Sequence, residues 1–117
     1  MKSVLVVLLA VMLVGCASMV RDGAIIRVQD NLADGDYADA IAIADRALNA
    51  YDYSDDQRAQ LLFMKAVSYQ NLEDYQTALA LYGYLAYKYP DTEYGFRAAT
   101  ILESVEQSRG KQGARPL

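Results

Sequence analysis

Few side chains in this sequence could do covalent or acid–base chemistry. It has no histidine and one cysteine, Cys16, so Ser–His and Cys–His nucleophile pairs are excluded. The densest carboxylates are Asp52, Asp55 and Asp56, but a calcium loop also needs a glycine at its sixth position, and that glycine is missing. The 7 glycines are scattered and form no phosphate-binding loop. We therefore expect no enzyme activity, no metal and no cofactor, and the aspartates are better explained as helix caps.

Cys16 stands directly behind the most hydrophobic run of the chain. Lys2 supplies a positive charge, and the residues from Val4 to Val14 carry no polar side chain. A bilayer-spanning helix needs about 20 apolar residues, so this shorter run is typical of a signal-peptide hydrophobic region behind a basic start. Residues 1–15 are therefore expected to be a targeting segment.

The residues Leu13-Val14-Gly15-Cys16 resemble the lipobox of bacterial lipoproteins. The resemblance implies cleavage before Cys16, a diacylglycerol on its sulfur and acylation of the new amino terminus, and several acyl chains on one residue anchor a protein stably. In that family an Asp after the cysteine favours the inner membrane. Ala17 and Ser18 stand here instead, which implies the outer membrane, facing the periplasm. The alternative is that Cys16 is one more small apolar residue of an uncleaved anchor.

Removal of residues 1–15 would leave 102 residues, enough for one domain with a modest core. We expect a short linker at 16–20, a folded part at 21–108 and a disordered tail at 109–117 whose charges are all basic, namely Arg109, Lys111 and Arg115. Between residues 16 and 108 the chain carries 7 basic and 15 acidic side chains. Such a surface repels phosphate backbones, so nucleic-acid binding is not expected.

The sequence repeats when it is shifted by 38 residues, which places Gly35–Tyr51 on Glu73–Tyr89. The aligned apolar positions recur with the spacing of one face of an amphipathic helix. A weaker match continues upstream, where Ile25–Val28 falls on Phe63–Ala66, so the repeated unit is a pair of helices. The aligned apolar pairs are Tyr37/Tyr75, Ala40/Ala78, Ile41/Leu79, Ala44/Tyr82, Ala47/Leu85, Leu48/Ala86 and Tyr51/Tyr89.

Capping residues and a proline predict where the helices begin and end. Ser54 and Gln57 have capping-box spacing, and Asp36, Asp74 and Asp91 are placed to accept from free backbone N–H groups. Pro90 should end the fourth helix. We expect an all-α chain with no strand and helices near 20–34, 36–51, 55–71, 74–89 and 92–108.

This pattern resembles the tetratricopeptide repeat, a 34-residue helical hairpin. The first copy departs from the family at Asn31, where a tyrosine is usual, and at Asp52, where a proline is usual. The resemblance implies a helical-hairpin solenoid of about two and a half repeats in five helices, with units at 21–53 and 55–90 and a capping helix at 92–108. It is carried in the second copy by Leu62, Ala66, Tyr69, Tyr75, Ala78, Tyr82, Leu85 and Pro90, and in the first by Gly35, Tyr37, Ala40, Ala44 and Ala47.

The family binds partners in a groove lined by the first helix of each unit. Amides and apolar groups there would suit a peptide or a partner helix. The alternative is that half of these residues pack against a neighbouring helix or the linker. Carried onto this sequence, the groove residues are Ile25, Gln29, Leu32, Gln60, Phe63, Val67, Gln70 and Asn71.

The tyrosines suggest a second kind of ligand. Of the 10 tyrosines, Tyr69, Tyr75, Tyr82 and Tyr89 fall on the packing stripe, so we expect them in the core, whereas Tyr53, Tyr84 and Tyr87 are freer. An exposed tyrosine surface would suit a glycan or another small ligand.

The leading expectation is a membrane-anchored periplasmic scaffold that binds a protein or peptide. The segment YGYLAYKYPDTEYGFRAA is similar to segments of the lipoprotein subunit of the outer-membrane β-barrel assembly machine and of periplasmic cell-division coordinators, which implies a role in envelope assembly. A glycan-binding lipoprotein and a purely structural tether with a basic tail are the alternatives. Because two and a half repeats are near the lower limit of stability, a partner or a homodimer is expected to help.

Overall fold

The computed structural model describes residues 1–113, apart from the side chains of residues 13–18, 112 and 113. The described chain is all-helical and contains no strand, as predicted. Its helices are α1 (Lys2–Ala33), α2 (Tyr37–Ala50), α3 (Asp55–Asn71), α4 (Tyr75–Lys88) and α5 (Glu93–Gly113). The predicted ends of α2, α3 and α4 agree with the observed ends to within one residue.

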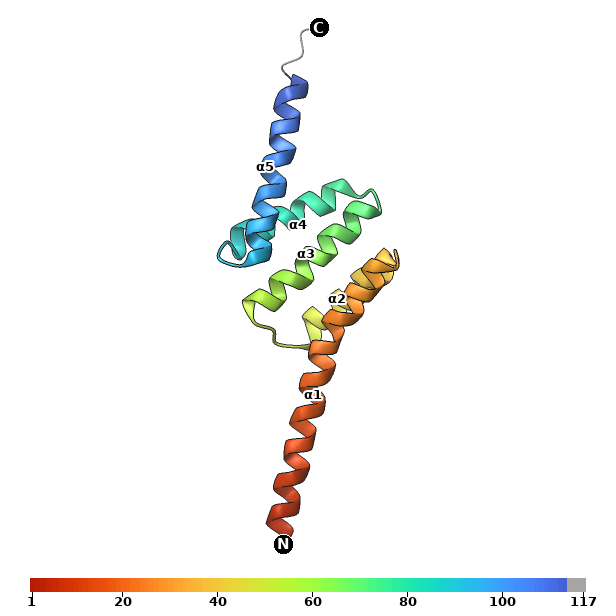
Figure 1. Ribbon diagram of the computed structural model, residues 1–117, viewed down its shortest axis with the longest axis vertical. Coiled ribbons are helices and arrows are strands. Elements are labelled where there is room, and N and C mark those ends of the chain that lie inside the picture. Colours follow the sequence, from red (N-terminus) through yellow and green to blue (C-terminus); the bar gives the residue numbers. More distant parts are fainter. Residues whose placement is uncertain (114–117) are drawn as a thin grey trace.

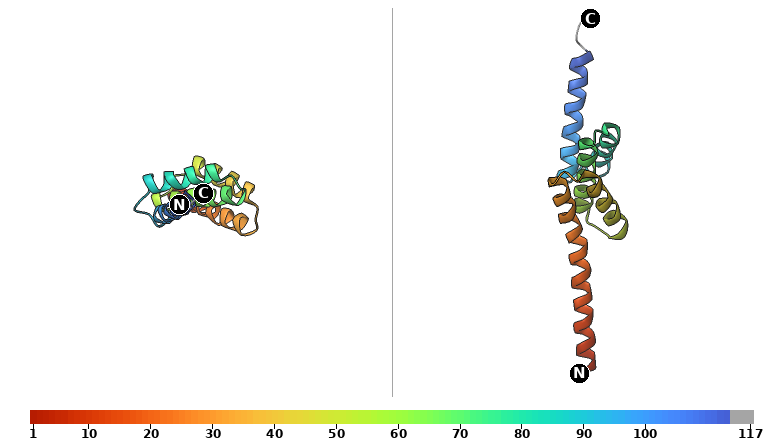
Figure 2. Two further views of the ribbon diagram at one scale, coloured as in Figure 1. Left: turned by 90° about the horizontal axis from the view of Figure 1, so that it is seen from above. Right: turned by 90° about the vertical axis from the view of Figure 1, so that its right-hand side faces the viewer.

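Helix α3 is the centre of the fold, because it packs against α1, α2, α4 and α5 (Figure 1). Each helix also packs against the next one along the chain, whereas α2 and α4 make no contact within the described residues. The helices α1, α3 and α5 therefore form one layer, and α2 and α4 form a second layer against one face of the first (Figure 2). Two successive helical hairpins, α1–α2 and α3–α4, are followed by the single helix α5.

The molecule is elongated, with extents of 84 × 29 × 18 Å, because α1 and α5 run out of the packed body in opposite directions (Figure 1). Along α1 the apolar side chains from Val4 to Met12 are exposed, and Ala24 is the first buried residue among the side chains that the structure describes. The hydrophobic cores thus begin after the predicted targeting segment. No helix among the described residues combines the length and apolar character needed to cross a bilayer.

Both ends of the folded part differ from the prediction. The backbone is helical from Lys2, so α1 begins well before the predicted helix start near residue 20. Helix α5 continues to Gly113, past its predicted end at residue 108, while residues 114–117 lie outside the described part. The prediction used the end of the hydrophobic stripe, but a helix that has begun gains one hydrogen bond per added residue without needing to pack.

The two hairpin turns repeat each other at the predicted spacing. At the end of α1, the N–H of Gly35 donates to Leu32 O and that of Asp36 donates to Asn31 O. At the end of α3, the N–H groups of Glu73 and Asp74 make the corresponding bonds to Gln70 O and Tyr69 O. These bonds form a Schellman motif, which requires a left-handed residue. Gly35 (φ 81°) and Glu73 (φ 65°) occupy that position.

The helix caps agree with the prediction in part. Ser54 and Gln57 form the capping box, and Asp74 accepts from Thr77 N at 3.3 Å. Asp36 makes no side-chain cap. At α5 the cap is Thr92 rather than Asp91, since the Thr92 hydroxyl accepts from Gly95 N at 3.0 Å and donates to Tyr89 O at 2.7 Å.

Two hydrophobic clusters make up the core. The first joins α1, α2 and α3 and is rich in alanine, with Ile25, Val28, Leu61 and Met64 as its larger aliphatic members. The second joins α3, α4 and α5 around Tyr82 and Leu85. Tyr82 and Tyr89 are buried and Tyr69 is partly buried, as expected from the stripe. The stripe is wrong for Tyr75, which is 58 % exposed, and Tyr53, expected to be free, is buried.

Candidate functional site

An apolar pocket of about 340 Å³ opens between α3 and α5. We call it the α3–α5 pocket; its lining residues are Phe63 from α3 and Phe96, Arg97, Thr100 and Ile101 from α5. Phe96 is 70 % exposed. Phe96 and Thr100 lie one helical turn apart, so both point to the same face of α5.

Phe63 is held in place by two tyrosines, whereas Phe96 is not enclosed. The ring of Phe63 lies 5.6 Å from that of Tyr82 and 5.3 Å from that of Tyr94, measured between centroids. Arg97 pairs with Glu93 at 2.7 Å and stacks over the Tyr94 ring at 5.3 Å. The inner wall of the α3–α5 pocket is therefore rigid, and its outer wall is a phenylalanine that a second molecule could cover.

Only Phe63 among the predicted groove residues lines this pocket. Ile25 is 8 % exposed and belongs to the first core cluster, and Val67 packs against the second. At these two positions the apolar side chains pack between neighbouring helices, which is the alternative considered for half of the groove residues.

The amides of the predicted groove have separate surroundings. Gln70 accepts a hydrogen bond from the Tyr82 hydroxyl at 2.9 Å, and Asn71 donates to Val67 O of its own helix at 2.8 Å. Gln29 is exposed on α1, while Leu32 and Gln60 are half-buried. Two of the predicted amides, Gln70 and Asn71, are thus engaged in hydrogen bonds within the chain.

Phe96 is the residue that sequence reasoning missed. Groove positions were carried only onto the first helices of the two complete hairpins, and α5 was assigned as a cap. Yet α5 follows α3 in the same layer, as α3 follows α1. An apolar residue on α5 outside its packing stripe was the available signal.

A smaller apolar pocket of about 220 Å³ lies where α5 leaves α4, between Tyr75 and Leu79 on one side and Ile101 and Val105 on the other. Its floor includes Tyr82 and Gln70, whose mutual hydrogen bond satisfies both polar groups. This pocket explains the exposure of Tyr75, since α5 diverges before it can cover the start of α4.

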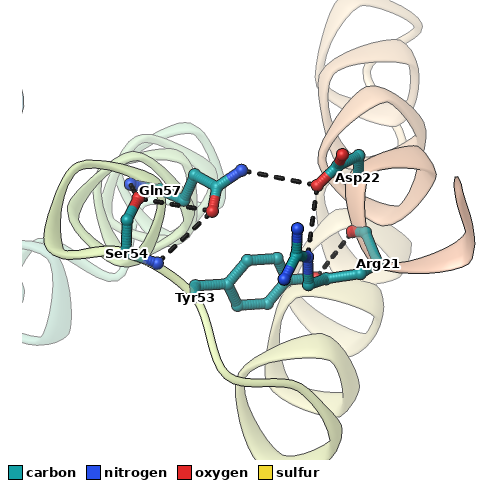
Figure 3. Close-up of polar contacts among 5 residues, drawn as sticks. All are labelled: Arg21, Asp22, Tyr53, Ser54 and Gln57. Carbon is teal, nitrogen blue, oxygen red and sulfur yellow. Dashed lines mark hydrogen bonds and ion pairs between the residues drawn. The ribbon is translucent and has the colours of Figure 1, made fainter. Parts of the chain in front are cut away.

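The loop between α2 and α3 is tied to α1 by a polar network (Figure 3). The Tyr53 hydroxyl donates to Arg21 O at 2.7 Å, and Gln57 Nε2 donates to Asp22 Oδ1 at 3.4 Å. Burial is the main cause that raises the pKa of Tyr53 above its ordinary value, so the hydroxyl keeps its proton and remains a donor at neutral pH. The network fixes the first hairpin against the start of α3.

The polar chemistry of the described residues is limited. No three His, Cys, Asp or Glu side chains come together there in an arrangement suited to a metal ion. The backbone at Cys16 is helical, and its side chain lies outside what the structure describes. The described surfaces can therefore bind apolar side chains of another molecule and, at a few positions, charged side chains.

Comparison with known proteins identifies no relative: no protein-family model, no curated protein and no solved structure matches this chain.

Proposed function

We propose that this protein is a lipid-anchored scaffold of the bacterial cell envelope, built as a tetratricopeptide-like array of about two and a half repeats. The order of packing supports this proposal, because the first helices of successive hairpins lie side by side and the second helices do not touch. The repeated Schellman turns at Gly35 and Glu73 support it as well. The partner is a protein or peptide, and no nucleic acid is involved.

The observation that carries the proposed binding role is the exposure of Phe96 beside Phe63 in the α3–α5 pocket. Burial of apolar surface stabilises a complex by about 25 cal/mol per Å² before the costs of association. A partner helix or extended peptide could place an apolar side chain between the two phenylalanines and cover both. The proposed groove therefore keeps Phe63 and adds Phe96, Thr100 and Ile101 from α5.

The anchor is proposed on Cys16, with residues 1–15 removed. The exposure of the side chains from Val4 to Met12 supports this, because neither core cluster would lose a contact if they were cleaved. The described end of α5 and the start of α1 lie at opposite ends of the molecule (Figure 1). An outer-membrane anchor would then direct α5 into the periplasm, where a partner can reach the α3–α5 pocket.

The anchor is tested by metabolic labelling with an alkyne analogue of palmitate in a bacterial host. We expect label on the wild-type chain and none on the Cys16→Ser variant, which should also leave the membrane fraction. An Ala17→Ser variant is the matched control and should label normally. Equal labelling of wild type and Cys16→Ser would remove the lipid anchor from the proposal.

The groove is tested by a photo-reactive phenylalanine analogue at position 96, with position 87 as the control. Tyr87 is 84 % exposed on α4, in the other layer of the molecule. We expect one discrete crosslinked protein from position 96 and not from position 87. Phe96→Ser should abolish co-purification of that protein without unfolding the chain, since Phe96 is mostly exposed. Crosslinks to glycan, or only from position 87, would favour the glycan-binding alternative.

A further inference from the structure

A third pocket, which we call the end pocket, lies between α1 and α2 and has a volume of about 170 Å³. Ala24 and Ala47 form part of its lining, and both are buried. Arg27 from α1, Arg46 from α2 and Tyr51 from the end of α2 line it as well. Two arginines, both exposed, thus line one small pocket with a partly apolar floor, in a chain whose net charge is −4.

No described carboxylate neutralises these two arginines. The ion pairs in the described chain join Arg21 to Asp22, Lys65 to Asp45 and Arg97 to Glu93. The Arg46 side chain donates one hydrogen bond among the described residues, from Nε to Ala42 O of its own helix at 3.4 Å. Like charges that share a pocket repel each other, and a single anion between them would turn that repulsion into two charge-assisted hydrogen bonds.

The second hairpin shows what occupies the equivalent position. Arg27 aligns with Lys65 at the repeat spacing of 38 residues. Lys65 of α3 forms its ion pair with Asp45 of α2, the helix that covers this face of α3. None of the described helices covers the corresponding face of α1. In the second hairpin, the cation at this position therefore pairs with a carboxylate from a neighbouring segment. By analogy, we expect Arg27 to accept a carboxylate from a segment that packs against α1.

The wall of the end pocket is held in a defined position. Tyr51 packs edge-on against Tyr53 with ring centroids 6.1 Å apart, and the Tyr53 hydroxyl is bonded to Arg21 O (Figure 3). Asp22 lies in the same region, but Arg21 and Gln57 engage it. Because these contacts position Tyr51 in advance, a ligand would not have to order the loop on binding.

We propose that the end pocket binds one carboxylate side chain of an acidic segment in a partner protein, held between Arg27 and Arg46. The pocket is smaller than the roughly 300–1,000 Å³ of whole-ligand sites, so it suits a single side chain. Guanidinium groups bind phosphate as well as carboxylate, so the choice of a carboxylate rests on the ion pair that Lys65 makes with Asp45 at the equivalent position of the second hairpin. The inference does not depend on the α3–α5 pocket.

The test uses the full chain, labelled with ¹⁵N, in non-ionic detergent micelles at low salt. Acetyl-Ala-Glu-Ala-amide is titrated while the Nε–H resonances of Arg27 and Arg46 are followed, and acetyl-Ala-Gln-Ala-amide is the matched control. We expect both resonances to shift saturably with the Glu peptide and the Gln peptide to bind at least about tenfold more weakly. A tenfold difference corresponds to about 1.4 kcal/mol.

Variants separate charge from geometry. Arg27→Gln together with Arg46→Gln should abolish the response, and Lys88→Gln, which removes an exposed cation outside the pocket, should leave it intact. Arg46→Lys keeps the charge but lacks the planar fork that binds both carboxylate oxygens, so we expect weaker but measurable binding. Circular dichroism checks that each variant keeps its helices.

Three results would overturn the proposal. They are equal responses to the Glu and Gln peptides, a response that survives in the double variant, and a stronger response to inorganic phosphate than to the Glu peptide. Vesicles with and without anionic phospholipid provide the last comparison. Binding to anionic vesicles through Arg27 and Arg46, with no response to the Glu peptide, would assign the pocket to a lipid headgroup instead.

Discussion

The hairpins α1–α2 and α3–α4 share one turn but have different cores. The turns use the same hydrogen bonds 38 residues apart. At one equivalent buried position the first hairpin has Ala44 and the second has Tyr82. The comparison indicates that the turn and a few small contact residues set the hairpin geometry, while the volume at other positions can change.

The difference in volume also explains why the surfaces differ. Ala24 and Ala47 line the end pocket in the first hairpin, and Leu62 and Leu85 stand at the equivalent positions in the second. Leucine fills the space that alanine leaves, and α2 covers that face of α3. The first hairpin therefore presents a charged pocket to solvent, whereas the second is enclosed between α2 and α5.

Replacement of Tyr82 by alanine should have the largest effect. Tyr82 is 2 % exposed, donates to Gln70 and packs against Phe63, so Tyr82→Ala should lower the free energy of unfolding by about 3–5 kcal/mol. Urea denaturation followed by circular dichroism measures it. Tyr75→Ala, at an exposed position, should cost less than about 1 kcal/mol. Similar losses for the two variants would contradict the assignment of Tyr82 as the centre of the second core.

Gly95→Ala tests how α5 is seated on the second hairpin. A Cβ at Gly95 would collide with the carbonyl of Tyr89, so the turn must shift, at a cost of about 1–3 kcal/mol. Gly83, within α4, has open space at the same position, and Gly83→Ala should raise stability by about 0.5–1 kcal/mol through helix propensity. Thermal unfolding compares the two, and stabilisation by both changes would argue against the close contact.

The turns themselves give the smallest predicted effects, of opposite sign. Glu73 holds a left-handed conformation that costs a residue with a Cβ about 1–2 kcal/mol, so Glu73→Gly should stabilise the second hairpin by about 1 kcal/mol. Gly35→Ala should destabilise the first by a similar amount. Urea midpoints of the two variants provide the measurement. Changes of the same sign would show that the turns are not equivalent.

Much of the local structure could be predicted from sequence. The starts of α3 and α4 follow from the capping box at Ser54 and the Asp74 cap, and the end of α4 follows from Pro90. Such signals act through bonds within a few residues, so their effect is nearly independent of the rest of the fold. Two wrong boundaries lie in α5. Its cap was assigned to Asp91 rather than Thr92, and its end was assigned too early because the assignment followed the end of the hydrophobic stripe.

The candidate sites were predicted less well. The periodic stripe placed Tyr75 in the core and left Tyr53 free, and the structure reverses both. A stripe identifies the face of a helix that is apolar, but it does not say where along that face a neighbour ends. Helix α5 diverges before it reaches Tyr75, and the α2–α3 loop folds back so that Tyr53 reaches Arg21.

By itself the sequence determined the helical class, the repeat of 38 residues and the turns, because periodicity and capping are local properties. Only the tertiary structure decided that Phe96 lies beside Phe63, and that Arg27 and Arg46 share one pocket. These neighbours are distant along the chain, and their meeting depends on how the helices cross. The packing volumes of many side chains together set the angles at which the helices cross, so no single sequence motif predicts them.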